Sequence, residues 1–317
     1  MTIAWIIGSS GLLGSALSRR LRQDGTELFL PAERFRWNNE SEVEIQITAA
    51  SRTFATRAAV AGRWEIYWAA GVGNMSSAEG DLERETRALG TLLTNIQSDM
   101  RLRDTPGALA FASSAGAIYA GSRDYIINEN TNPAPTTPYA YEKLRQEDMV
   151  SSFARDNSSI QVLLARLSTI YGPGQSTGKQ QGLIAHIARC MLGNHPIKIF
   201  VPFDTIRDYV FSDDAASMIV MALRAIQERS RVVTKIIASE HPTTIAEIIS
   251  LFKRIKRRAP RIITSANRLS QLYPRCVRFR SIVICESAAL PKTSLPVGIA
   301  QLMAAEQATF ARSSRRA

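Results

Sequence analysis

The first 25 residues place an apolar run, a turn and a helix-like repeat in direct succession. Residues 3–7 are all apolar, as in a short strand that is buried on both faces. Leu13, Leu17 and Leu21 then recur at helical spacing, and Gly25 stands where such a helix would end. The pattern predicts a buried strand followed at once by an amphipathic helix.

Apolar strand patterns and amphipathic helix patterns continue to alternate through the first half of the chain. The pattern predicts further strands at residues 27–30, 64–70, 109–113 and 160–167, and helices at 81–98 and 139–153. Strands that alternate with helices imply an α/β fold with a doubly wound parallel sheet.

The regular alternation loosens after residue 172. We expect one domain over residues 1–172, a return of the chain to its sheet within 205–240, and a smaller mixed α/β part over 173–317. Thr244 and Glu247 have the spacing of a capping box ahead of a helix. The residues after 309 look like a frayed basic tail.

The turn after the first strand carries glycine at positions 8, 11 and 14. A helix N-terminus presents unpaired N–H groups and a positive dipole end, which suit an anion. Gly8 permits a tight turn, Gly11 lets a pyrophosphate approach the backbone, and Gly14 lets the helix pack closely on the strand. Because the turn lies between a strand and a helix, it predicts a Rossmann-type dinucleotide site rather than a flexible loop. Ser10 and Leu12 are expected to bind the cofactor as well.

Composition is that of an ordinary globular protein, with 317 residues, 45% hydrophobic and 21% charged. No apolar run has the length of a membrane helix, and no leader precedes the first strand, so we expect a soluble cytoplasmic protein without a membrane partner. The three cysteines and three histidines lack metal-ligand spacing, so we expect neither disulfides nor a bound metal.

The net charge of +11 is concentrated in one stretch. Residues 251–280 contain ten Lys or Arg and no acid, so 11 − 10 leaves about +1 for the rest of the chain. Such a stretch can bind a phosphorylated ligand or nucleic acid, or it can be a solvated face with a loop. Because no nucleic-acid motif accompanies it, we expect no nucleic-acid partner.

Tyr139 and Lys143 are four residues apart in a helix-forming segment, so they should lie on one helix face. A phenol with its usual pKa of about 10 is a poor base at neutral pH. An ammonium nearby favours the phenolate and lets tyrosine exchange a proton with a carbinol or a ketone. We therefore expect Lys143 to lower the pKa of Tyr139. A surface pair without a chemical role is the alternative.

Together these motifs resemble the extended short-chain dehydrogenase/reductase family, which includes NAD-dependent nucleotide-sugar epimerases, dehydratases and ketoreductases. The resemblance covers nearly the whole chain. It is carried by Gly8, Gly11 and Gly14, Ala69–Gly71, Ser113–Ser114, Tyr119, Tyr139, Lys143, Arg166, Tyr171–Gly174, and Arg207–Val210 with Asp213 and Asp214.

The resemblance implies hydride transfer between a sugar carbon and nicotinamide, with Tyr139 moving the proton. Ser114, which lies 25 residues before Tyr139, would orient the reacting oxygen, with Ser113 in reserve. Tyr139 and Lys143 would also contact the cofactor, together with Ala70 and Gly71.

Arg207 would by resemblance lie near the substrate, where a guanidinium suits a diphosphate. A structural ion pair with Asp208, Asp213 or Asp214 is the alternative. The resemblance also implies a homodimer formed through two helices.

The end of the second predicted strand departs from the family pattern. Ala32 stands where many relatives have an acid for the adenosine ribose. Arg34 and Arg36 can pair with a 2′-phosphate instead, which favours NADP over NAD. Because Glu33 is an acid at nearly the same place, NAD is the alternative cofactor. Arg87 also replaces an asparagine that many relatives carry.

We therefore expect an NAD(P)-dependent enzyme that either epimerises a nucleotide-linked sugar or reduces its 4-keto form. Dehydration is disfavoured, because Ala115 and Gly116 follow Ser114 where dehydratases carry an acid pair. A non-catalytic dinucleotide sensor or scaffold on the same fold is the alternative function.

Overall fold

Six parallel strands form the central sheet, in the order β2-β1-β3-β4-β5-β9. The computed structural model describes residues 1–71, 73, 77, 79–157, 159–175, 182–226, 231–264, 275–283 and 292–314. The strands are β1 (Ile3–Ile7), β2 (Glu27–Phe29), β3 (Trp64–Trp68), β4 (Gly107–Ser114), β5 (Ile160–Leu167) and β9 (Val232–Ile237). The predicted doubly wound α/β sheet is confirmed. The strand order reverses at β1, and at such a point a crevice lies outside the carboxyl ends of the strands, here those of β1 and β3.

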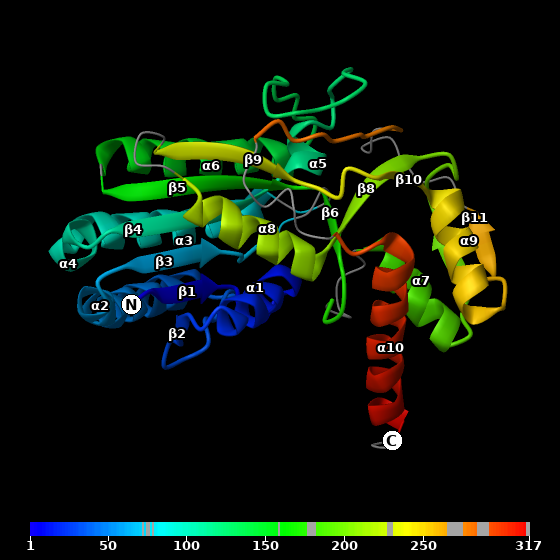
Figure 1. The fold of residues 1–317 in the computed structure, drawn as a ribbon, viewed down its shortest axis with the longest axis horizontal. Coiled ribbons are helices and arrows are strands. Elements are labelled where there is room, and N and C mark those ends of the chain that lie inside the picture. Colours follow the sequence, from blue (N-terminus) through cyan, green and yellow to red (C-terminus); the bar gives the residue numbers. More distant parts are fainter. Residues whose placement is uncertain are drawn as a thin grey trace.

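Helices cover both faces of this sheet (Figure 1). The helices α1 (Leu12–Gln23) and α8 (Ser212–Arg224) pack on one face. The other face is covered by α2 (Glu40–Ala61), α3 (Glu79–Ser98) and α6 (Pro138–Asp156). Two short helices, α4 (Met100–Asp104) and α5 (Ala115–Ile118), flank β4.

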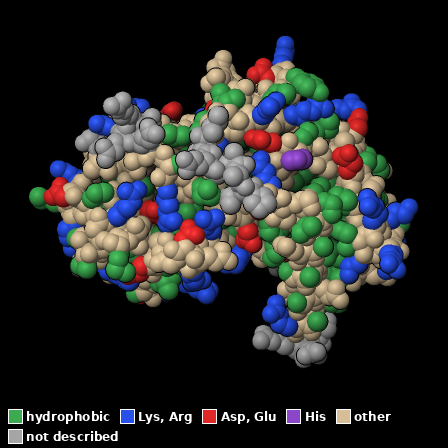
Figure 2. Space-filling view, in the orientation of Figure 1, with side chains coloured by type: hydrophobic (Ala, Val, Ile, Leu, Met, Phe, Trp, Pro, Cys, Tyr) green, Lys and Arg blue, Asp and Glu red, His purple; other side chains and the backbone are tan. Residues whose placement is uncertain are grey.

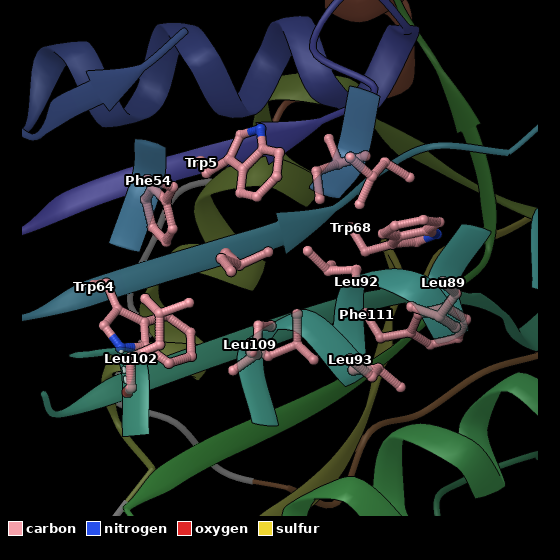
Figure 3. Close-up of a cluster of buried hydrophobic side chains, with 14 of the residues drawn as sticks. Trp5, Phe54, Trp64, Trp68, Leu89, Leu92, Leu93, Leu102, Leu109 and Phe111 are labelled. Atoms are coloured by element: carbon pink, nitrogen blue, oxygen red, sulfur yellow. Dashed lines mark hydrogen bonds between the residues drawn. The ribbon is translucent and has the colours of Figure 1, made fainter. Parts of the chain in front are cut away.

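The larger core lies under α2, α3 and α6 and is rich in tryptophan (Figure 3). Trp5 and Phe54 pack with their ring centroids 5.3 Å apart. Trp64 is fully buried, and its indole N–H donates to the carbonyl of Leu102 at 3.0 Å. These rings fix α2 and α4 against the sheet, since large aromatic side chains dominate the energetics of a core.

The 22-residue helix α2 was not among the predicted elements. Its buried positions include small residues such as Ala50, Ala55 and Ala58, so no strong apolar stripe marks it in the sequence. The signals that could have found it are at its ends. Asn39 caps its N-terminus by accepting from the amide of Glu42, and the residue after its last turn, Gly62, has a left-handed φ of 80°.

The described residues of the C-terminal part form two small sheets and three helices beside the carboxyl ends of the central strands (Figure 1). One sheet has the order β10-β8-β6 and the other pairs β11 with β7. The strands are β6 (Thr169–Tyr171), β7 (Ile197–Ile199), β8 (Ile206–Phe211), β10 (Pro242–Thr244) and β11 (Ile262–Thr264), and the helices are α7 (Leu183–Leu192), α9 (Ile245–Lys256) and α10 (Leu295–Ser314).

Two predictions about this part have different outcomes. The capping box is confirmed, because Thr244 accepts from the amide of Glu247 and the Glu247 carboxylate accepts from the amide of Thr244. The prediction of a frayed tail after residue 309 was wrong up to Ser314, where α10 ends. The alanine-rich sequence sustains this helix, and Glu306 pairs with Arg189 of α7 at 3.0 Å.

Residues 251–264 of the basic stretch belong to α9, β11 and the turn between them, whereas residues 275–280 run beside β8 and Ile127. Lys and Arg side chains are spread over the face of the molecule that Figure 2 shows. The side chains of Arg258 and Arg261 both donate to Asn194. Residues 265–274 lie outside the described residues. None of the described helices is long and apolar enough to cross a membrane.

Candidate active site

The glycine turn brings the end of β1, the end of β3 and the start of α1 together. Gly8 has a left-handed φ of 88°, and a Cβ there would lie 2.6 Å from the amide nitrogen of Ala70. A Cβ on Gly14 would lie 2.1 Å from the carbonyl oxygen of Gly8. Both positions therefore exclude any side chain. Gly11 forms the N-cap of α1 without a side-chain cap, so the first N–H groups of that helix face the crevice unpaired.

A cavity of about 380 Å³ opens beside this turn. It is lined by five of the predicted cofactor residues, namely Gly8, Ser10, Gly11, Ala70 and Gly71. Leu12 and Gly14 do not line the cavity; Leu12 begins α1 and Gly14 packs under the turn.

Other lining residues, none of them predicted as site residues, come from the loop after β2, from α2 and from α3. The loop after β2 contributes Trp37 and Asn38, and α3 contributes Asp81, Arg84 and Glu85. The Trp37 ring packs edge-on against Trp68 at a centroid distance of 6.3 Å. One wall of the cavity is therefore aromatic and another is charged.

Tyr139 and Lys143 lie one turn apart near the start of α6. Thr137 caps this helix by accepting from the amide of Ala140 at 3.3 Å, and Pro138 occupies the first turn, where its missing N–H has no cost. The Lys143 ammonium lies 5.9 Å from the centroid of the Tyr139 ring and 5.1 Å from that of Phe111 on β4. The predicted pair thus faces the carboxyl end of β4.

The two serines at the end of β4 have different surroundings. The Ser114 side chain hydrogen-bonds to Tyr139 and also accepts from the amide of Ala117 at 3.4 Å. The Ser113 hydroxyl is buried and has no hydrogen-bond partner among the described residues. Ser114, and not Ser113, therefore lies next to the phenol.

The pKa of Tyr139 is raised above its usual value, so the expectation that Lys143 would depress it was wrong in net sign. Burial is the largest cause, because a phenolate loses its water in the interior. The charge of Lys143 does act in the predicted direction, and so does the bond to Ser114, but the carboxylate of Glu85 opposes them. The pair alone does not determine the outcome.

Glu85 is a site residue that the sequence interpretation missed. Its carboxylate accepts from the Lys143 ammonium at 2.7 Å, and both side chains are at most 5% exposed. Burial lowers the pKa of Lys143, but the attraction of Glu85, Tyr139 and Glu147 together outweighs burial, and the pKa is raised. A signal was present: Glu85 lies three residues after Leu82 and four before Leu89, on the apolar face of α3.

A buried ion pair anchors the next turns of α6 to the sheet. Arg166 on β5 donates to Glu147 at 2.6 Å and also to the Tyr119 hydroxyl. Burial works against the Arg166 charge, yet the Glu147 carboxylate raises the pKa of Arg166. This pair fixes the helix that carries Tyr139 and Lys143.

Arg34 lies on the exposed loop after β2 and does not line the cavity. Its guanidinium has no hydrogen bond or ion pair with any described residue. Arg36 pairs with Glu42 at 3.0 Å, and the Glu33 carboxylate accepts from Gln46. Unlike Arg36, Arg34 therefore has N–H donors that no described residue binds and that a ligand could bind.

Arg207 lies half-buried on β8 and donates to the carbonyl of Ile206 at 2.7 Å. The three acids considered as its partners bind elsewhere. Asp208 accepts from Ser168 and Ser239, Asp213 pairs with Arg19, and Asp214 accepts from Thr293. Arg87, the other departure from the family pattern, donates to Glu40 of α2 at 2.9 Å.

The sequence pattern of the NAD dependent epimerase/dehydratase family matches residues 4–234. The chain belongs to this family. It is 29% identical over 110 residues to a UDP-glucose 4-epimerase of Mycolicibacterium smegmatis, which covers 35% of each chain. It is also 28% identical over 115 residues to a dTDP-4-dehydro-6-deoxyglucose reductase of Escherichia coli, which covers 36% of each. The chain spans about half, or less, of the length of the curated relatives it matches.

The fold resembles that of a solved family structure over nearly its full length. The UDP-glucose 4-epimerase of Thermotoga maritima, crystallised with UDP-glucose, matches 98% of this chain and 100% of its own with a TM-score of 0.80. The sequence identity is 21%, so this likeness concerns the fold.

Proposed function

We propose that the chain is an NAD(P)-dependent enzyme that transfers hydride at a carbon of a nucleotide-linked sugar, either to epimerise the sugar through a 4-keto intermediate or to reduce such a ketone. The observation that carries the proposal is the meeting of Tyr139, Lys143 and Ser114, which do not line the cavity at the glycine turn themselves but reach its wall through the contact of Lys143 with Glu85. A sensor or scaffold has no use for a buried proton donor. The names of the relatives, an epimerase and a reductase, agree with the two forms of this reaction.

The cavity fits a dinucleotide on its own geometry. The uncapped N-terminus of α1 offers N–H groups and a positive dipole end to a pyrophosphate, and the lack of a Cβ at Gly8 lets the backbone of Ala70 close in on the turn. Ala70 and Gly71 close the opposite side at the end of β3. A nicotinamide bound there supplies or accepts the hydride.

The protein residues handle the proton and the reacting oxygen. Tyr139 donates its proton to the sugar oxygen in reduction and takes it back in oxidation. Ser114, bonded to the phenol, orients the same oxygen. The Lys143 ammonium stabilises the phenolate, and Arg207 is proposed to bind the diphosphate of the substrate. For the cofactor, the guanidinium of Arg34, which pairs with no described residue, favours NADP over NAD.

The test compares wild type with Tyr139→Phe on UDP- and dTDP-linked hexoses and their 4-keto forms. Epimerisation is followed by NMR and reduction by NADPH absorbance. We expect kcat to fall by at least about 100-fold in the variant, because general acid–base catalysis is lost, while cofactor affinity stays. Ser113→Ala is the control and should keep its activity. Cofactor binding without turnover in wild type would instead indicate a sensor.

The predicted homodimer and the predicted cytoplasmic location stay predictions. A groove lined by Leu93 and Gly90 of α3 and by Met149 of α6 is the surface that we propose for the dimer contact. A mass in solution of twice 34.9 kDa would support it.

A further inference from the structure

Glu85 is a buried carboxylate for which the proposed reaction has no role. It lies on α3, lines the dinucleotide cavity and contacts Lys143 rather than solvent. Acidic residues are seldom fully buried unless they are paired, and here the partner is the proposed catalytic lysine. The pair joins two helices across 58 residues of sequence.

Neighbouring side chains hold this ion pair in one arrangement. The Gln146 carbonyl accepts from Lys143 at 2.9 Å, and the Gln146 amide donates to the Thr86 hydroxyl at 2.8 Å. Thr86 in turn bonds to Glu142. The ammonium is therefore fixed from both α3 and α6, at its distance of 5.9 Å from the Tyr139 ring centroid.

The charges that act on the phenol of Tyr139 come from two elements, α6 and α3. Lys143 on α6 and Glu85 on α3 act on the phenol directly, β4 contributes the uncharged Ser114 and Phe111, and the pair of Glu147 on α6 with Arg166 on β5 acts only through Lys143. Glu147 and Arg166 neutralise each other in their own ion pair. The balance at the phenol thus depends on Lys143 and Glu85, which act in opposite directions.

We propose that Glu85 is a positioning residue that fixes the Lys143 ammonium and offsets its charge, so that Tyr139 enters the reaction as a proton donor. The proposal rests on the proposed function and deepens it, because it favours reduction of a keto sugar. In that step the carbonyl carbon takes a hydride from the reduced dinucleotide, the oxygen takes the Tyr139 proton, and the resulting phenolate recovers a proton from solvent.

The kinetic test is Glu85→Gln, which removes the charge and keeps the shape. Loss of the carboxylate leaves the Lys143 charge unopposed, so the pH at which Tyr139 loses its proton should fall by about one unit or more. We therefore expect the alkaline limb of the kcat profile to move to lower pH, with KM for the sugar little changed. Glu83→Gln, an exposed position on the same helix, is the matched control and should keep the wild-type profile.

A second readout needs neither cofactor nor turnover. The ultraviolet difference between each protein and its Tyr139→Phe counterpart gives the ionisation of this phenol directly. The phenol should ionise at lower pH in Glu85→Gln than in wild type, and Glu85→Asp, which keeps the charge, should lie nearer to wild type. The proposal would be overturned if the pH of Tyr139 ionisation were the same in Glu85→Gln as in wild type, or if Glu85→Gln and Glu85→Asp shifted it equally. A shifted ionisation without turnover on any nucleotide sugar would refute the proposed function alone.

Discussion

Arg34 and Arg36 lie on the same loop, yet an acid pairs with only one of them among the described residues. If the cofactor is NADP, Arg34→Ala should weaken NADPH binding about tenfold or more, because a charge-assisted bond to the 2′-phosphate is lost. NADH binding should stay unchanged. Arg36→Ala is the control, since Glu42 already occupies that guanidinium. Cofactor fluorescence titration measures all of these, and tighter NADH than NADPH binding in wild type would contradict the assignment.

At the scale of one element, the capping box decides how α9 begins. The helix contributes Ile248 and Phe252 to the core of the C-terminal part, so its stability matters for that core. Thr244→Ala removes an N-cap bond and should lower the free energy of unfolding by about 1 kcal/mol, measured by urea denaturation. Thr53→Ala, at an exposed position inside α2, should change it by less than about 0.5 kcal/mol. Equal losses in both variants would show that the cap is unimportant.

At the scale of the whole molecule, buried tyrosines should set the alkaline limit of stability. Burial is the largest cause of a raised pKa at Tyr67, Tyr119, Tyr171 and Tyr209, and it raises the pKa of Tyr209 to about 12. A tyrosine in the unfolded chain ionises near pH 10, while the buried tyrosines of the folded protein keep their protons. Ionisation therefore stabilises the unfolded state alone, and the free energy of unfolding falls as pH rises above about 10.

Thermal unfolding between pH 8 and 12 measures this loss. Tyr209 alone should contribute about 2–3 kcal/mol of it by pH 12, because its pKa is shifted by about two units. Tyr209→Phe should therefore lose less stability over this range than wild type does. A melting temperature that stays constant to pH 12 would contradict the argument.

The sequence by itself determined what depends on neighbours along the chain. The apolar run of β1, the glycine turn, the capping box and the strand at 160–167 all follow from periodicity and local hydrogen bonding, and the structure confirms them. The family follows from the same motifs, because their order and spacing are linear properties. Helix α2 was not predicted, because several of its buried positions are alanines, which do not give the sequence an apolar stripe at helical spacing.

Only the tertiary structure decided what depends on burial and on groups far apart in sequence. It brought Glu85 to Lys143, placed Ser114 rather than Ser113 beside the phenol, and raised the pKa of Tyr139 where the local pair predicted a fall. The physical reason is that water stabilises a charged group in the unfolded chain, and folding removes that water from a buried group. Once water is gone, burial itself disfavours the phenolate of Tyr139, and Glu85, 58 residues from Lys143 in sequence, opposes the effect of the lysine on the phenol.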